Sequence, residues 1–327
     1  MPQFSRFASK NSLTVGRRKR IIAAIIASGF QGTVSGYTSN ERSGTAINHI
    51  DKFPFATDSN ASVVGDLSQK RGAASGQSSD THGYTSGGLR PPPPSTTTNV
   101  STIDKFPFAS DGNAAYIGSL TIGLSSSAGQ SSSENGYVSG GQKQPNNSSD
   151  VRLEIQKFPF ASDASASNIG NLTARRYVAA GQSSNDNGYM SGGRESIPLG
   201  PIRSTIDKFP FASDANATGV GNLSQARQSI SGQSSDVSGY TSGGFAPPPN
   251  FLVNTIDKFS FASDGNASDV GDLTGAKNGT IGQSSTSSGY VSGYGTGIEK
   301  FSFASDSNGT SVGNLTAQPG GGAGQQV

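Results

Sequence analysis

The stretch DKFPFASDGNAAYIGSL at residues 104–120 decides the fold, because the chain contains six copies of it. The other copies begin at Asp51, Gln156, Asp207, Asp257 and Glu299. In all six, the first Phe lies 23 residues before the Gly of a Gly-Gln pair, and in five it lies 30 residues before the Gly of a Gly-Tyr pair. From the Gly-Tyr pair to the next copy the distance varies between 12 and 23 residues. An insertion between paired strands breaks their register, whereas an insertion in a loop costs little. The constant spacings therefore predict folded units joined by variable loops.

The composition restricts the chemistry. Only 31% of the 327 residues are apolar, 45 are Gly, and there is no Cys or Trp. Without Cys there are no disulfides or thiolate sites, and two histidines (His49 and His82) argue against His-based metal sites and relays. A net charge of +2 argues against a nucleic-acid binder. The repeated Asp residues (Asp58 and its equivalents) are spread around any symmetric ring instead of forming a catalytic pair. We expect no catalytic residues, no cofactor, no metal and no enzymatic activity.

Each unit is predicted to contain four short strands. Phe106 and Phe108 alternate onto one face of a strand, with Pro107 between them indicating an edge or outer position, or a bulge. The ASD-x-N segment has the composition of a turn, and the Val/Ile-Gly-x-Leu segment that follows is a second strand. The small residues around Gly-Gln suit an inner strand where backbones approach closely, and the Gly-Tyr-x-Ser segment alternates as a fourth. The chain is therefore predicted to be all-β.

Four strands per unit, six units and a period near 50 residues predict a β-propeller of six blades. The units resemble kelch repeats, whose Tyr-x-x-Gly-Gly element is matched at 84–88, 137–141, 189–193 and 240–244. The blades depart from the kelch pattern because they have no Trp. We therefore expect the repeated aromatic residues to supply the packing between blades: Phe53, Phe106, Phe158, Phe209, Phe259 and Phe301, with Tyr84, Tyr137, Tyr189, Tyr240 and Tyr290.

The two ends of the chain predict how the ring closes. Residues 1–20 form a degenerate half repeat, and 21–327 form the propeller. The segment IIAAII at 21–26 follows a basic run and resembles the start of a secretory signal. It also aligns with the inner strands and is too short to span a bilayer. We assign it to the inner strand of the first blade and expect no membrane insertion. Residues 323–326 also align with an inner strand, so the last strand could pair with the N-terminal part and seal the ring. Seven blades, using the half repeat, is the alternative.

The variable loops are the candidate contact surface. Those that follow the Gly pairs are rich in Pro and all leave one face of the predicted ring. Pro-rich segments present side chains at low entropic cost. The candidate contact residues are Leu89, Pro92, Pro198, Phe245, Pro248 and Phe251.

The whole FPFASD–VG-x-L–GQSS–GY-x-SGG repeat, over residues 48–327, resembles virion structural proteins of tailed bacteriophages, particularly marine and cyanobacterial ones. This resemblance implies a non-enzymatic tail, baseplate or fibre component in several copies per particle. Its partners would be other virion proteins, and it would be assembled in the bacterial cytoplasm. The second hypothesis is a carbohydrate-binding or adhesion propeller that contacts a host surface glycan through the repeated Tyr residues.

Overall fold

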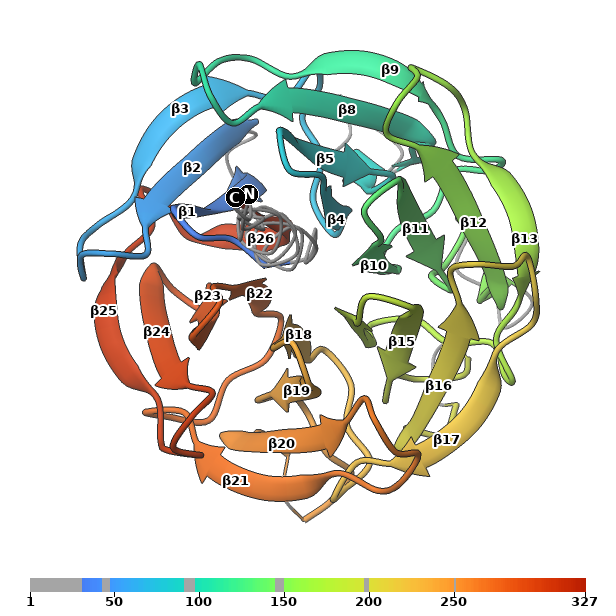
Figure 1. Ribbon diagram of the computed structural model, residues 1–327, viewed down its shortest axis with the longest axis vertical. Coiled ribbons are helices and arrows are strands. Elements are labelled where there is room, and N and C mark those ends of the chain that lie inside the picture. Colours follow the sequence, from blue (N-terminus) through green and yellow to red (C-terminus); the bar gives the residue numbers. More distant parts are fainter. Residues whose placement is uncertain (1–30, 43–47, 91–97, 145–149, 197–199, 250) are drawn as a thin grey trace, which may run out of the picture.

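The protein is a six-bladed β-propeller. A computed structural model describes residues 31–42, 48–90, 98–144, 150–196, 200–249 and 251–327. Six four-stranded antiparallel sheets stand radially around a central axis (Figure 1). The predicted all-β class and six blades are confirmed, and the seven-bladed alternative is wrong. Among the described residues, no helix has the length and apolar character needed to cross a membrane.

Each blade is numbered here from its innermost strand outward. Blade 1 contains β26 (Pro319–Gln326), β1 (Ser35–Arg42), β2 (His49–Pro54) and β3 (Ser62–Asp66), and blade 2 contains β4 (Ser75–Ser78), β5 (His82–Ser86), β8 (Thr102–Pro107) and β9 (Ala115–Ser119). Blade 3 contains β10 (Ala128–Ser131), β11 (Asn135–Ser139), β12 (Glu154–Pro159) and β13 (Ser167–Asn171), and blade 4 contains β14 (Ala180–Ser183), β15 (Asn187–Ser191), β16 (Thr205–Pro210) and β17 (Thr218–Asn222). Blade 5 contains β18 (Ser231–Ser234), β19 (Ser238–Ser242), β20 (Thr255–Ser260) and β21 (Ser268–Asp272), and blade 6 contains β22 (Ile281–Ser284), β23 (Ser288–Ser292), β24 (Gly297–Ser302) and β25 (Thr310–Asn314). A two-stranded sheet, β6 (Leu89–Arg90) and β7 (Thr98–Asn99), lies in a loop of blade 2.

The repeated proline lies in the third strand, which is paired on both sides and is not an edge. In blade 2, Pro107 is the last residue of β8, and the last pair between β8 and β9 is at Lys105. The missing N–H of Pro107 therefore removes no ladder bond. The strand pair also contains a register shift, but at Ile103 and Asp104, away from the proline.

The ring is closed by its last strand. β26 pairs antiparallel with β1, with Gly36 opposite Gln326 and Ser39 opposite Ala323. The inner position of blade 1, which the sequence assigned to residues 21–26, is thus filled by β26, so that assignment is wrong. Residues 1–30, including the predicted half repeat, lie outside the described part of the chain.

Aromatic side chains join each blade to the next. The ring of Tyr84 in blade 2 lies 5.6 Å from Phe158 and 4.6 Å from Phe160 in blade 3, measured between centroids. The same Tyr-Phe-Phe group recurs at the other five interfaces, where the tyrosines are Tyr37, Tyr137, Tyr189, Tyr240 and Tyr290. Each fully buried Phe stabilises the fold by about 1.5–3 kcal/mol. The Gly that precedes each Tyr is also required, because a Cβ at Gly83 would lie 2.3 Å from the ring of Phe106.

Buried ion pairs connect most of the blades as well. Arg227, in the segment after β21's equivalent in blade 4, lies 2.7 Å from Asp257 of blade 5, and neither side chain is exposed to solvent. Equivalent pairs join Arg71 to Asp104, Arg176 to Asp207 and Lys277 to Glu299. Burial lowers the pKa of the Arg227 guanidinium, and the nearby Asp257 carboxylate opposes that shift. Between blades 2 and 3, Leu124 and Gln156 occupy the two positions, so the chain itself shows that a neutral pair fits there.

We predict that Arg227→Leu alone destabilises the protein by about 3–5 kcal/mol, because it leaves the carboxylate of Asp257 buried without a cation. The double variant Arg227→Leu with Asp257→Gln copies the Leu124 and Gln156 pair and is expected to recover most of this loss. Urea unfolding of the two single variants and the double variant measures the coupling. Additive losses in the double variant would show that the two side chains are not a stabilising unit.

Alkaline pH should unfold the protein cooperatively. Burial raises the pKa of all six interface tyrosines above the ordinary value of 10, and that of Tyr290 to about 12. Folding favours the neutral phenol, so this stability is complete below pH 10 and is lost as the pH rises towards 12. In that window each buried phenol lowers the free energy of unfolding by about 1.4 kcal/mol per pH unit.

Urea unfolding between pH 8 and 12 tests this dependence. Tyr290→Phe should reduce the slope above pH 10 by one phenol's share, whereas Tyr116→Phe, at a position 59% exposed, should leave it unchanged. Equal slopes for both variants and the parent would contradict the assignment.

Candidate functional site

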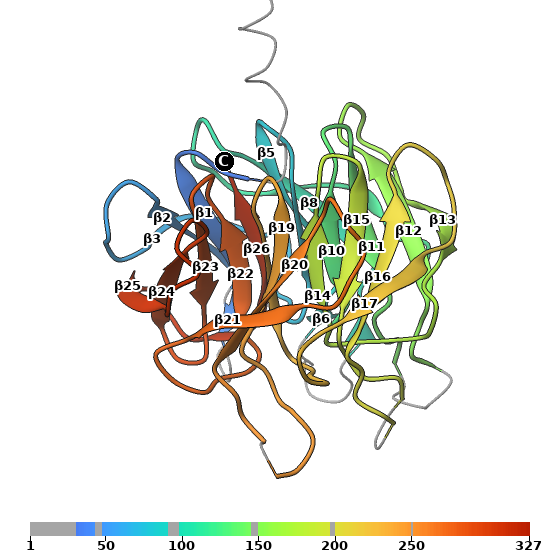
Figure 2. The ribbon, with the colours of Figure 1, turned by 60° about the horizontal axis from the view of Figure 1, so that its bottom comes forward.

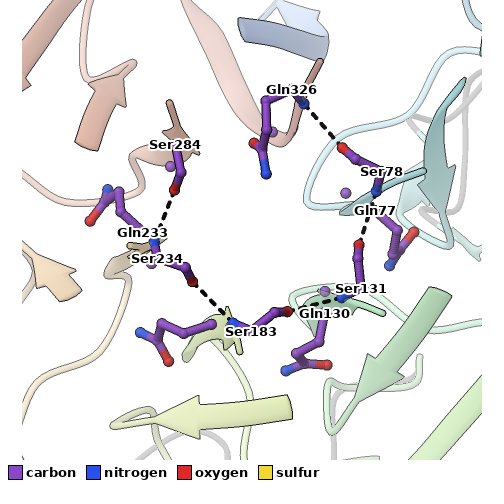
Figure 3. A pocket seen from close by; sticks show the side chains of 16 residues that line it. Gln77, Ser78, Gln130, Ser131, Ser183, Gln233, Ser234, Ser284 and Gln326 are labelled. Atoms are coloured by element: carbon purple, nitrogen blue, oxygen red, sulfur yellow. Dashed lines mark hydrogen bonds between the residues drawn. The ribbon is translucent and has the colours of Figure 1, made fainter. Parts of the chain in front are cut away.

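The inner strands line a narrow channel along the axis. In its upper section, the serine that ends each inner strand accepts a hydrogen bond from the backbone N–H of the preceding blade (Figure 3). The N···Oγ distances run from 2.9 to 3.0 Å, from Gln326 to Ser78 and then through Ser131, Ser183, Ser234 and Ser284. These serines therefore join neighbouring blades as well as lining the channel.

The glutamine of each inner strand crosses to the next blade. Gln182, only 2% exposed, donates from Nε2 to the backbone oxygen of Tyr240 at 3.0 Å. Its Oε1 accepts from Ser191 of its own blade at 2.7 Å. The same Nε2 bond to a tyrosine carbonyl recurs at all six interfaces, for Gln77, Gln130, Gln233, Gln283 and Gln325. Both ends of the amide are thus occupied by structural contacts.

The inner glycines bring the strands to their closest approach. A Cβ at Gly129 would lie 2.1 Å from the carbonyl oxygen of Gly76, and the corresponding distances at Gly76, Gly181, Gly232, Gly282 and Gly324 are 2.0 to 2.2 Å. The channel is accordingly small, with cavities of about 60 Å³ beside the serines and 110 Å³ below them. Among the described residues that line these cavities there is no acidic, basic or histidine side chain. The channel is a neutral, hydrogen-bonding space suited to a few waters.

The repeated tyrosines are not available to a ligand. Tyr84, Tyr137, Tyr189, Tyr240 and Tyr290 are 0–2% exposed, as are four of the six first phenylalanines of the repeat, with Phe259 and Phe301 at 3% and 2%. A glycan on the surface could not stack on these rings. The tyrosine-based carbohydrate site of the second hypothesis is therefore wrong for the folded protein.

The two faces of the ring differ. The turn face carries the ASD-x-N turns, where a lysine of each blade pairs with an aspartate of the next, as in Lys52 to Asp111 at 2.8 Å. All six interfaces have such a pair; the others join Lys105, Lys157, Lys208, Lys258 and Lys300 to Asp163, Asp214, Asp264, Asp306 and Asp58. Both partners are partly exposed, so each pair contributes little to stability and is screened by salt.

The loop face carries the variable segments that leave blades 2–5 after the Gly pairs (Figure 2). In each pair both glycines have positive φ, for example 65° at Gly87 and 111° at Gly88, and the second turns the chain outward. The base of each loop is held by short bridges, such as Phe245 to Gln228 and to Leu252.

The predicted contact residues have different exposures on this face. Phe251 is 55% exposed and its ring lies 5.8 Å from that of the half-buried Phe245. Pro248 is exposed, and Leu89 is half-buried in β6. Pro92 and Pro198 lie outside the described residues. Two exposed residues that the prediction omitted, Leu252 and Tyr294, also lie on loops of this face.

Comparison with solved structures identifies the fold. The structure of YjhT is similar to this chain. The two superpose with a TM-score of 0.63 and 12% sequence identity, over 81% of this chain and 93% of YjhT. At this identity the likeness concerns the fold alone. No protein family and no curated protein matches the sequence.

Two kinds of functional contact were not predicted from the sequence: the glutamine bonds to tyrosine carbonyls and the buried ion pairs. The ion pairs did leave a signal, because the basic residue is absent in the unit that ends at Leu124 and the acidic residue is replaced by Gln156 in the next unit. Such paired changes between successive repeats indicate a contact across the interface.

Replacing an inner glycine tests the packing of the channel. We predict that Gly129→Ala lowers the free energy of unfolding by about 1–3 kcal/mol, because its Cβ would overlap a backbone oxygen that cannot move freely. Gly112→Ala is the matched control, since nothing lies within 4 Å of its Cβ position, and it should change stability by less than about 0.5 kcal/mol. Urea unfolding measures both, and an equal effect of the two substitutions would contradict the close packing.

Proposed function

We propose that the protein is a non-enzymatic structural component of a tailed bacteriophage particle, located in the tail, baseplate or fibre region. In this role the propeller is a rigid scaffold in several copies per particle, and its loop face binds other virion proteins. The resemblance of the repeat over residues 48–327 supports the particle assignment.

The observation that carries the scaffold role is how the repeated residues are used. Polar motif side chains that could perform chemistry already bond to the neighbouring blade, as Gln182 does to Tyr240 and Asp257 does to Arg227. The asparagine of the ASD-x-N turn is used in the same way, since Asn216 Oδ1 accepts from the backbone N–H of Asn171 in the preceding blade. A sequence that spends its motif on blade-to-blade contacts leaves recognition to the loops.

Host-surface glycan binding by the same loop face is the second candidate. The exposed rings of Phe251 and Tyr294, 55% and 51% exposed, favour it, because aromatic faces stack on sugar C–H groups. A glycan array with the purified protein separates the two functions, as the scaffold role predicts no binding together with stoichiometric presence in particles.

We predict that Phe251→Ser combined with Leu252→Ser lowers incorporation into particles at least tenfold while leaving the thermal midpoint unchanged, because both side chains are exposed and support no packing. Val237→Ser, on the turn face and 65% exposed, is the matched control and should be incorporated normally. Quantitative mass spectrometry of purified particles gives the measurement. Absence of the parent protein from particles would refute the virion role, and equal incorporation of all variants would refute the role of the loop face.

A further inference from the structure

The interface between blade 6 and blade 1 lacks two contacts found elsewhere in the ring. At the mouth of the channel on the loop face, backbone bonds run from Gly279 to Ser229, Val178, Ser126, Ala73 and Gly321. In the described part of the chain, no bond closes this series between Gly321 and Gly279. The position that holds a buried basic residue at four interfaces is Pro319 here.

The strand that closes this interface is itself a weak strand former. Four of the eight residues of β26 are glycine, against one of four in each other inner strand. Glycine within a strand has a high entropic cost and no side chain to pack. The pairing of β26 with β1 also contains a register shift between Asn40 and Arg42.

A short segment spans this interface on the turn face. The N–H of Gly32 donates to the carbonyl oxygen of Ser284 at 2.9 Å, and the N–H of Thr286 donates to that of Gly32 at 3.1 Å. The N–H groups of Val34 and Ser35 both donate to the carbonyl oxygen of Val327, at 2.6 and 3.0 Å. Residues 31–34 thus bond blade 6 on one side and the end of the closing strand on the other.

Two further features show that this segment is fitted to its place. Gln31 is 8% exposed and donates from Nε2 to the carbonyl oxygen of Ser234 in blade 5 at 3.0 Å. A Cβ at Gly32 would lie 2.6 Å from the carbonyl oxygen of Val327 and 2.7 Å from the ring of Phe55. Only glycine can therefore bring the backbone this close to both blades.

We propose that residues 31–34 are a latch that keeps β26 paired within its own chain. When the latch is released, β26 leaves β1 and exposes an unpaired strand edge. The complementary strand for that edge is the β26 of a second copy, so the released protein forms strand-exchanged dimers.

Gly32→Val tests the latch, with Gly265→Val as the matched control because nothing lies within 4 Å of that Cβ position. We expect amide exchange at 35–42 and 319–326 to become at least tenfold faster in Gly32→Val, with blade 4 unchanged, and dimers to appear with rising concentration in light scattering. Unchanged exchange in these two strands would overturn the proposal. Equal acceleration in every blade would also overturn it, since the segment would then be an ordinary part of one cooperative fold.

A disulfide distinguishes strand exchange from other association. The N–H groups and carbonyls of Ser35 and Val327 bond reciprocally, each at 3.0 Å, an arrangement whose Cα separation suits a disulfide. The chain has no native cysteine to interfere. In the Gly32→Val background, Ser35→Cys with Val327→Cys, oxidised as a dilute monomer, should suppress the dimer, and reduction should restore it. Dimers that persist in the oxidised monomer preparation would overturn the exchange mechanism.

Discussion

Six inner strands converge on one axis, and a glycine in the middle of each sets how close they come. With a Cβ position only 2.0 to 2.2 Å from the carbonyl oxygen of the neighbouring strand, any other residue there would push two blades apart. The cross-blade contacts depend on this spacing. Gln182 reaches the carbonyl of Tyr240 and Ser234 accepts from Ser183 only because adjacent inner strands lie side by side. The aromatic groups and buried ion pairs farther out then fill the widening gap between blades.

The sequence was sufficient to predict the blades because the constant spacings of 23 and 30 residues span paired strands, where length is fixed by register. It was insufficient where a contact joins different repeats. Nothing within one repeat shows that Asp257 meets the Arg227 of the preceding unit, or that Gln182 bonds a backbone oxygen of the next. Residues 21–26 were misassigned because an apolar pattern resembles an inner strand, whereas the true occupant, β26, is half glycine and was recognised only as the second claimant.

This division between repeat and loop explains what the site is and is not. The motif residues that a search for chemistry would choose, including the repeated Tyr and Asp, are buried in contacts between blades. Surface that varies among the blades is concentrated in the segments that leave the loop face (Figure 2). The similarity to YjhT at 12% identity fits this view, because the fold can persist while almost every surface residue changes.

Saturation mutagenesis of the whole chain, scored separately for folding and for incorporation into particles, tests the central claim most directly. The account predicts that substitutions at the inner glycines, glutamines and interface aromatics reduce both scores together. Substitutions that reduce incorporation alone should fall on the loops of blades 2–5. The account would be contradicted if those substitutions mapped instead to the channel serines or to the turn face.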